Sequence, residues 1–119
     1  MPDIDNLRGA LDRWKAGIDA HEPRRVAEVF TEDAVFQGLR PYSIGHQGVV
    51  DYYSSQPPGM TVDYQILETR RLTADHELGY VHADFSFPDG RVVSVFLGVL
   101  ITRIEDNWRI AYYQASRLD

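Results

Sequence analysis

The sequence predicts an α+β domain in which helices come first and an antiparallel sheet follows. In the first half, apolar residues recur mainly at the spacing of a helix, whereas after Met60 they alternate with polar residues at a period of two. The stretch Ser54–Gly59, with two prolines and a glycine, separates the halves. Because 119 residues fit one domain and no linker or repeat divides them, residues 1–119 are predicted to form a single domain.

The first predicted helix carries one apolar stripe and ends near His21. Its stripe recurs at i, i+4, i+7 and i+11 and consists of Leu7, Leu11, Trp14 and Ile18. Pro23 disfavours helical geometry at the residue before it and suits the first turn of a second helix, expected over residues 23–30. The remaining elements of this half are a strand, a loop and a short helix, expected over residues 33–37, 38–45 and 46–54.

Four strands are predicted in the second half. Pro88-Asp89-Gly90 is typical of a tight hairpin turn between two of them. The strand after this turn is apolar on both faces, so we expect it in the centre of the sheet and covered on both sides. The strands are expected over residues 62–66, 78–87, 91–104 and 108–116.

Composition and motifs argue against several classes of function. A net charge of −6 disfavours a nucleic-acid partner, which would require clustered Lys and Arg. The absence of cysteine removes disulfides, thiolate nucleophiles and cysteine-ligated metals. We expect neither a bound metal nor a nucleotide or flavin cofactor, because H-x-H, H-E-x-x-H, G-x-G-x-x-G and Walker motifs are all absent. The four histidines are His21, His46, His76 and His82.

No membrane association is expected. The sequence has no apolar run approaching 18 residues, and Met1–Asp5 lacks the basic and apolar regions of a signal peptide. The predicted location is therefore the cytoplasm.

Four stretches of the chain carry a family resemblance: Trp14–His21 (WKAGIDAH), Val29–Phe36 (VFTEDAVF), Ile44–Val50 (IGHQGVV) and Ile104–Ile110 (IEDNWRI), which continues through Gln114–Ser116. They resemble sequence elements of the NTF2-like superfamily and, within it, of its SnoaL-like and SgcJ/EcaC-type branches. The resemblance implies a cystatin-like cone, with N-terminal helices packed on a strongly curved, mainly antiparallel sheet. It also implies that helices and sheet enclose a pocket for a small, largely apolar molecule.

The strand over residues 78–87 leaves two orientations open. In one, its apolar alternate residues face the core and the polar ones face water. In the other, which the resemblance favours, the polar set faces the pocket and the apolar set is buried in a dimer. His82 and Asp84 would then be candidate acid and base groups, similar in spacing to the Arg-x-Asp pair of limonene-epoxide-hydrolase-like members. Tyr80 belongs to the same set.

The last strand and several aromatic residues supply the other predicted pocket groups. The resemblance places Gln114 in the pocket, where its amide could hydrogen-bond a ligand, and Tyr112 would share its face and add a phenol donor. A plain alternative is that Gln114 bonds to neighbouring backbone. Trp14, Phe36 and Phe96 are expected as pocket walls, although an aromatic residue on a helix stripe is more often plain core.

The chain departs from the ketosteroid isomerases of this superfamily at each catalytic position. Their helix-1 tyrosine matches Trp14, their strand-1 aspartate falls near Gly38, and no acid occurs between Arg91 and Ile104. Three hypotheses therefore stay open: an acid/base enzyme without cofactor acting on a polyketide-like or terpenoid-like substrate, a non-catalytic binding domain, and an interaction domain. In each case we expect a homodimer formed through the outer sheet face.

Overall fold

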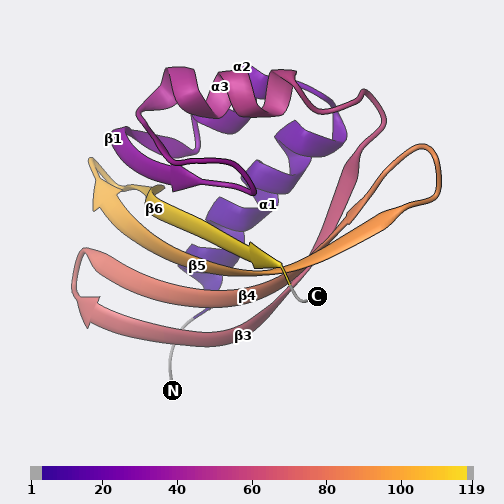
Figure 1. Cartoon of the computed structure of the whole chain (residues 1–119). Coiled ribbons are helices and arrows are strands. Elements are labelled where there is room, and N and C mark those ends of the chain that lie inside the picture. Colours follow the sequence, from indigo (N-terminus) through magenta and orange to yellow (C-terminus); the bar gives the residue numbers. More distant parts are fainter. Residues whose placement is uncertain (1–3, 118–119) are drawn as a thin grey trace.

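Three helices lie on one face of a curved six-stranded sheet in the computed structural model of the chain (Figure 1). The structure describes residues 4–117. In chain order, the elements are α1 (Asp5–Asp19), α2 (Pro23–Ala27), β1 (Phe30–Gln37), β2 (Ser43–Ile44), α3 (His46–Ser54), β3 (Thr61–Thr73), β4 (His76–Ser86), β5 (Val92–Ile104) and β6 (Asn107–Arg117). The predicted α+β class and the curved, mainly antiparallel sheet are confirmed.

The strands follow the order β2-β1-β6-β5-β4-β3. Strands β3 to β6 form an antiparallel meander, whereas β1 returns to pair in parallel with β6, with Phe36 opposite Tyr113. The helix predicted over residues 23–30 is too long. The backbone N–H of Ile110 donates to the carbonyl of Val29 at 2.8 Å, so the chain after α2 already pairs with the sheet. Strand β2 lies in a segment that was predicted as loop.

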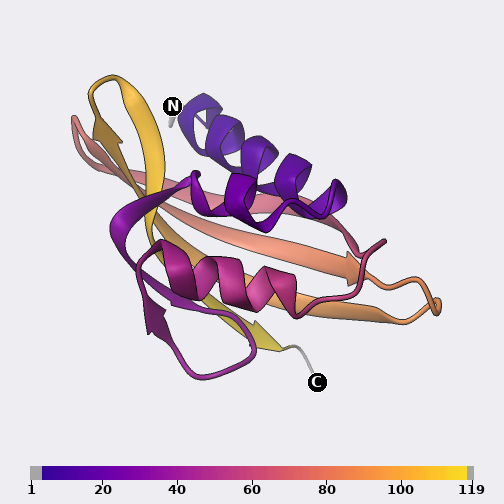
Figure 2. The same cartoon turned by 90° about the horizontal axis from the view of Figure 1, so that it is seen from above.

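The helices cover the concave face of the sheet, and α2 lies between α1 and α3 (Figure 2). The predicted stripe of α1 is confirmed, because Leu7, Leu11, Trp14 and Ile18 are all buried. A Cβ added to Gly79 of β4 would lie 2.5 Å from a methyl carbon of Leu7. The glycine thus lets α1 approach the sheet closely.

A second close approach joins α1 to α2 at Gly17. A Cβ added to Gly17 would lie 2.7 Å from a methyl carbon of Val26 and 3.0 Å from its backbone nitrogen. Gly17→Ala is therefore expected to lower the free energy of unfolding by about 1–3 kcal/mol through overpacking. Urea denaturation measures this loss.

Gly9 provides the control, because it lies in the same helix with no other atom within 4 Å of an added Cβ. Gly9→Ala should raise the free energy of unfolding by about 0.5–1 kcal/mol, the usual gain at an unconstrained helical position. Equal effects of the two substitutions would contradict the proposed contact between α1 and α2.

Aromatic side chains fill most of the space between helices and sheet. Phe36 stacks on Tyr113 with ring centroids 4.9 Å apart, and Phe30 meets both rings edge-on at 5.5 and 5.9 Å. Trp14 lies 6.0 Å from Tyr113. The interior of the cone is therefore mainly solid core.

Candidate functional site

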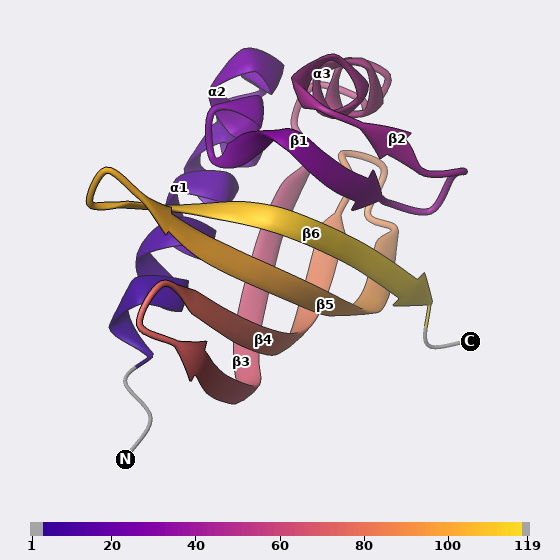
Figure 3. The same ribbon diagram turned by 90° about the vertical axis from the view of Figure 1, so that its left-hand side faces the viewer.

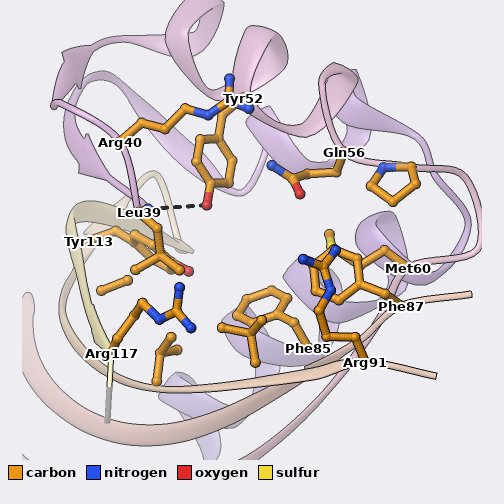
Figure 4. Close-up of a pocket in the computed structure, with 14 residues that line it drawn as sticks. Leu39, Arg40, Tyr52, Gln56, Met60, Phe85, Phe87, Arg91, Tyr113 and Arg117 are labelled. Atoms are coloured by element: carbon orange, nitrogen blue, oxygen red, sulfur yellow. Dashed lines mark hydrogen bonds between the residues drawn. The ribbon is translucent and has the colours of Figure 1, made fainter. Parts of the chain in front are cut away.

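A cavity of about 240 Å³ lies between α3 with the segment after it and the ends of β4, β5 and β6 (Figure 4). It is lined by Leu39, Arg40, Tyr52, Gln56, Pro57, Met60, Phe85, Phe87, Arg91, Val93, Val95, Tyr113, Ala115 and Arg117. Half of these residues lie in loops, where the sheet extends beyond the helices. The cavity is large enough for a small organic molecule.

The floor of the cavity is apolar and continuous with the core. Val95 and Ala115 are buried and project from the concave face of the sheet, beside the half-buried Phe85. Trp14 lies 6.0 Å from Phe85, ring centroid to ring centroid, on the core side. A ligand on this floor would therefore lie close to the indole of Trp14.

Two tyrosines, Tyr52 and Tyr113, line the cavity, and a third, Tyr53, is buried and bonded to Tyr113. The Tyr52 hydroxyl accepts a hydrogen bond from the backbone N–H of Leu39 at 3.2 Å, and Trp14 Nε1 donates to the Tyr53 hydroxyl at 3.1 Å. Tyr53 and Tyr113 are also hydrogen-bonded, and burial raises the pKa of both phenols well above the usual value. Both are therefore protonated at neutral pH and can donate hydrogen bonds, but they cannot serve as bases.

The raised pKa values of Tyr53 and Tyr113 predict a loss of stability in alkali. An unfolded tyrosine ionises near pH 10, while these folded ones hold their protons to higher pH. The contribution of these two tyrosines to the free energy of unfolding is complete below about pH 10 and is lost as the pH rises above that value. From pH 8 to pH 11, the midpoint of urea denaturation should fall less for Tyr53→Phe than for the natural chain. Tyr42→Phe, at a ring that is 65% exposed, should show the natural pH dependence.

Arginines surround the mouth of the cavity. Arg91 and Arg117 extend from the sheet side and Gln56 from the segment after α3, as Figure 4 shows, while Arg40 comes from the loop after β1. Among the described residues that line the cavity there is no Asp, Glu or His. The site thus combines an apolar floor, hydrogen-bond donors and a positively charged rim.

His82 and Asp84 do not face this cavity, and the orientation expected from the family resemblance is wrong. Val81 and Ala83 are fully buried under the helices, so the alternate residues point to the outer face. The close contact of Leu7 with Gly79 determines which face of β4 is inside, because α1 packs on the alternate residues that include Gly79, Val81 and Ala83. On the outer face, His82 Nε2 and Asp84 Oδ1 lie 3.6 Å apart, and Ser94 donates to Asp84.

The other expected pocket residues of β4, β5 and β6 also lie outside the cavity. Tyr80 and Phe96 stack on the outer face, with ring centroids 5.3 Å apart. On β6, Leu100 pairs with Tyr112 and Ile101 with Ile110, so Ala111 is an extra, unpaired residue. This bulge reverses the alternation. Tyr112 and Gln114 are therefore exposed and bonded to each other by their side chains, and Tyr113 lines the cavity instead.

Trp14 and Phe36 have the plain core role that was the alternative to pocket walls. They are 0% and 2% exposed and do not line the cavity. Gly38, near which the resemblance places the catalytic aspartate of ketosteroid isomerases, packs directly against Tyr52, since an added Cβ would lie 2.4 Å from the tyrosine ring. Tyr52 therefore occupies the space that a side chain at position 38 would need.

Sequence reasoning missed the residues that form the rim. Arg40 and Arg91 lie in a loop and beside a hairpin turn, where no periodic pattern marks them, and Gln56 lies in the segment that ends α3. The three arginines of the rim lie in segments that are far apart in the sequence. Only the folded meander brings these segments to one end of the sheet, so the sequence pattern does not reveal them.

A second, more open depression lies at the other end of β6. It is lined by Arg13, Arg25, Glu28, Val29, His46, Asn107 and Arg109. Burial and the neighbouring Arg109 lower the pKa of Arg13, whose guanidinium donates to the carbonyl of Trp108. An acidic residue and bonded arginines occupy this depression, so its character differs from that of the cavity.

The described residues contain neither a membrane-spanning helix nor a metal cluster. No helix between residues 4 and 117 is long and apolar enough to cross a membrane. In that same part of the chain, His, Asp and Glu side chains form no group of three or more that could hold a metal ion.

Comparison with known proteins identifies a domain family and a shared fold. A family model described as the SnoaL-like domain matches residues 11–113. No curated protein matches the sequence significantly. Among solved structures, a candidate calcium/calmodulin-dependent protein kinase II association domain from Xanthomonas campestris superposes with a TM-score of 0.84 at 13% identity, covering 99% of this chain and 89% of that one.

Two further solved structures are similar throughout. A ketosteroid isomerase-like protein from Erwinia carotovora atroseptica has a TM-score of 0.77 at 18% identity, and the match covers 98% of this chain and 96% of that one. A protein with a cystatin-like fold from Caulobacter vibrioides has a TM-score of 0.80 at 17% identity, with 97% and 89% covered. At these identities the similarity shows the fold alone, which is cystatin-like, or NTF2-like.

Proposed function

The chain belongs to the SnoaL-like domain family, and on this basis we propose that it binds a small molecule with an apolar body in the cavity under α3. The floor of Phe85, Val95 and Ala115 supports this proposal, because it offers apolar surface that a ligand can cover. The tyrosine hydroxyls and Gln56 can orient a polar group of the ligand.

Binding without catalysis fits this cavity better than acid/base chemistry. The observation that carries this choice is the composition of the described lining, which includes no carboxylate, imidazole or thiol. Proton transfer at neutral pH needs a group that titrates near pH 7. The buried phenol of Tyr113 is protonated there, because its pKa is raised, and arginine does not titrate in that range.

Titration with 2-naphthalenemethanol, an uncharged bicyclic alcohol, tests this function. In the variant Trp108→Phe, Trp14 is the remaining tryptophan, since the chain contains two. Its fluorescence should change saturably, with a dissociation constant of roughly 10 µM to 1 mM for a ligand of this size. No saturable change would contradict the proposal.

Adjacent positions on β6 provide a matched pair of blocking and control variants. Ala115 is buried and lines the cavity, whereas Ser116 is exposed on the outer face. Ala115→Leu should fill the cavity and weaken binding about tenfold or more, while Ser116→Leu should leave the affinity within about twofold. Equal losses in the two variants would show that the probe binds elsewhere.

We also propose a homodimer formed through the outer face of the sheet, the convex side of β4, β5 and β6 without a described helix (Figure 3). Large apolar side chains lie exposed on this face, among them Tyr80 at 43% and Tyr112 at 37%. Contiguous apolar surface of this kind marks interfaces between proteins. The description of the similar Xanthomonas campestris protein as an association domain also supports assembly.

Two finer interpretations stay predictions. One is membership of the SgcJ/EcaC-type branch, which rests on the motif resemblance. The other is the cytoplasmic location, which rests on the sequence pattern.

A further inference from the structure

We propose that the cavity selects ligands that carry an anionic oxygen group, a carboxylate in the first instance, beside their apolar body. This inference rests on the proposed function, because it names the ligand class of the same cavity. The apolar body would lie on the floor of Phe85 and Val95, and the anionic group would lie at the mouth, beside Arg91 and on the side of the lining that carries Arg40.

The charge at the mouth is opposite to that of the chain as a whole. The net charge is −6, with 18 acidic and 12 basic residues. The described lining nevertheless contains three arginines and no acidic residue. Charged side chains of one sign around a cleft with apolar walls raise the local concentration of the opposite ion. The rim therefore favours an anion even though the net charge of the chain is negative.

Arg91 is held in place beside the cavity. Its guanidinium carbon lies 4.4 Å from the centroid of the Phe87 ring, so the ring supports the flat group from one side. Asp89 Oδ1 accepts the backbone N–H of Arg91 at 3.0 Å, and Asp89 Oδ2 lies 3.9 Å from Arg91 Nε. Among the described residues, Asp89 is the sole acidic group within 4 Å of Arg91. The contact is long and leaves the guanidinium able to bind a ligand.

Arg40 approaches from the opposite wall. Its guanidinium carbon lies 6.0 Å from the centroid of Tyr52, whose ring also lines the cavity. No acidic side chain of residues 4–117 forms an ion pair with Arg40. The planar fork of a guanidinium matches the two oxygens of a carboxylate, so Arg91 can bind such a group, and the charge of Arg40 on the same lining adds to the attraction. Gln56 adds an amide donor near the same space (Figure 4).

The second basic depression does not offer the same combination. Glu28 lines it together with the arginines, and Arg25 forms an ion pair with Glu22 at 3.0 Å. An anion there would meet an acidic neighbour and no aromatic floor. The cavity under α3 is thus the place where an apolar body and a carboxylate can be bound together.

Two probes of the same shape test this selection: 2-naphthoate, which is anionic at pH 7.5, and the neutral 2-naphthalenemethanol. The natural chain should bind 2-naphthoate about tenfold more tightly than the alcohol. This preference should fall about fivefold in Arg91→Gln and further in the double variant Arg40→Gln/Arg91→Gln. Raising the salt concentration from about 0.05 to 0.5 M should also reduce the preference, because salt screens exposed charges.

Two control variants remove the same charge elsewhere. The Arg70 side chain on β3 is 61% exposed, close to the 63% of Arg91, and Arg109 lies in the second depression. Arg70→Gln and Arg109→Gln should each leave the preference for 2-naphthoate within about twofold. Circular dichroism and the unfolding temperature establish that each variant is folded.

The outcomes separate this inference from the proposed function. Equal affinities for the two probes would overturn the anionic selection and leave the proposed binding of the apolar body intact. The same conclusion would follow if Arg70→Gln lost as much of the preference for 2-naphthoate as Arg91→Gln. A loss confined to Arg109→Gln would place the anion in the second depression and overturn it as well. If neither probe binds, the proposed function itself fails.

Discussion

Trp14→Ala is expected to lower the free energy of unfolding by about 3–5 kcal/mol, a large part of the roughly 5–15 kcal/mol that stabilises a typical domain. The side chain is 0% exposed and meets Tyr64, Phe85 and Tyr113 at ring-centroid distances of 6.0–6.5 Å. Truncation leaves a cavity between α1 and the sheet and removes the donor to the Tyr53 hydroxyl. The Trp14 side chain thus connects α1 with the sheet and with α3.

Urea or thermal denaturation measures this loss. One further variant at position 14 separates its causes, and one at position 108 is the control. Trp14→Phe keeps an aromatic ring but removes the indole N–H, so it should cost less than Trp14→Ala and report the hydrogen bond to Tyr53 together with the lost volume. Trp108→Ala removes the other tryptophan, which is only half-buried, and should cost clearly less than Trp14→Ala. Similar losses at positions 14 and 108 would contradict the central role of Trp14.

Tyr80→Arg is expected to convert the proposed homodimer into a monomer. In a two-fold symmetric interface the same surface meets its own copy, so one substitution introduces two charges into the contact. Tyr80 is 43% exposed and stacks on Phe96 in the middle of the outer face. Desolvating an unpaired arginine there should raise the dimer dissociation constant about thirtyfold or more.

Light scattering coupled to gel filtration measures the change, from about twice the chain mass of 13.6 kDa to the chain mass itself. Leu72→Arg is the control, since Leu72 is 57% exposed near the β3–β4 hairpin rather than on the face of β4 to β6. This variant should remain dimeric. A natural chain that elutes as a monomer would contradict the dimer proposal, and dissociation of Leu72→Arg would place the interface elsewhere.

Local signals were enough to predict most of the elements. The stripe of α1 and the break at Pro23 both depend on nearby residues, as does the apolar character of β5. The extent of α2 was wrong because Val29 pairs with Ile110, a residue 81 positions further along the chain. A hydrogen bond at that separation leaves no sign in the local sequence pattern. Strand β2 has only two residues, which is too short to show an alternating pattern.

The candidate site was predicted less well, for two physical reasons. An alternating strand offers two faces, and which one meets the helices is decided by packing between elements, such as Leu7 against Gly79. The bulge at Ala111 then exchanges the roles of Tyr112 and Tyr113, although the sequence of β6 continues without interruption. The predicted polar residues of both strands therefore lie on the outer face.

The sequence by itself determined the α+β class, the family and the aromatic character of the interior, because periodicity, turn residues and motifs are local properties. Only the tertiary structure decided which strand faces line the cavity and that Arg40, Arg91 and Arg117 all belong to its lining. These arginines lie in three separate segments, and only the assembled meander and the return of β1 to β6 bring them together.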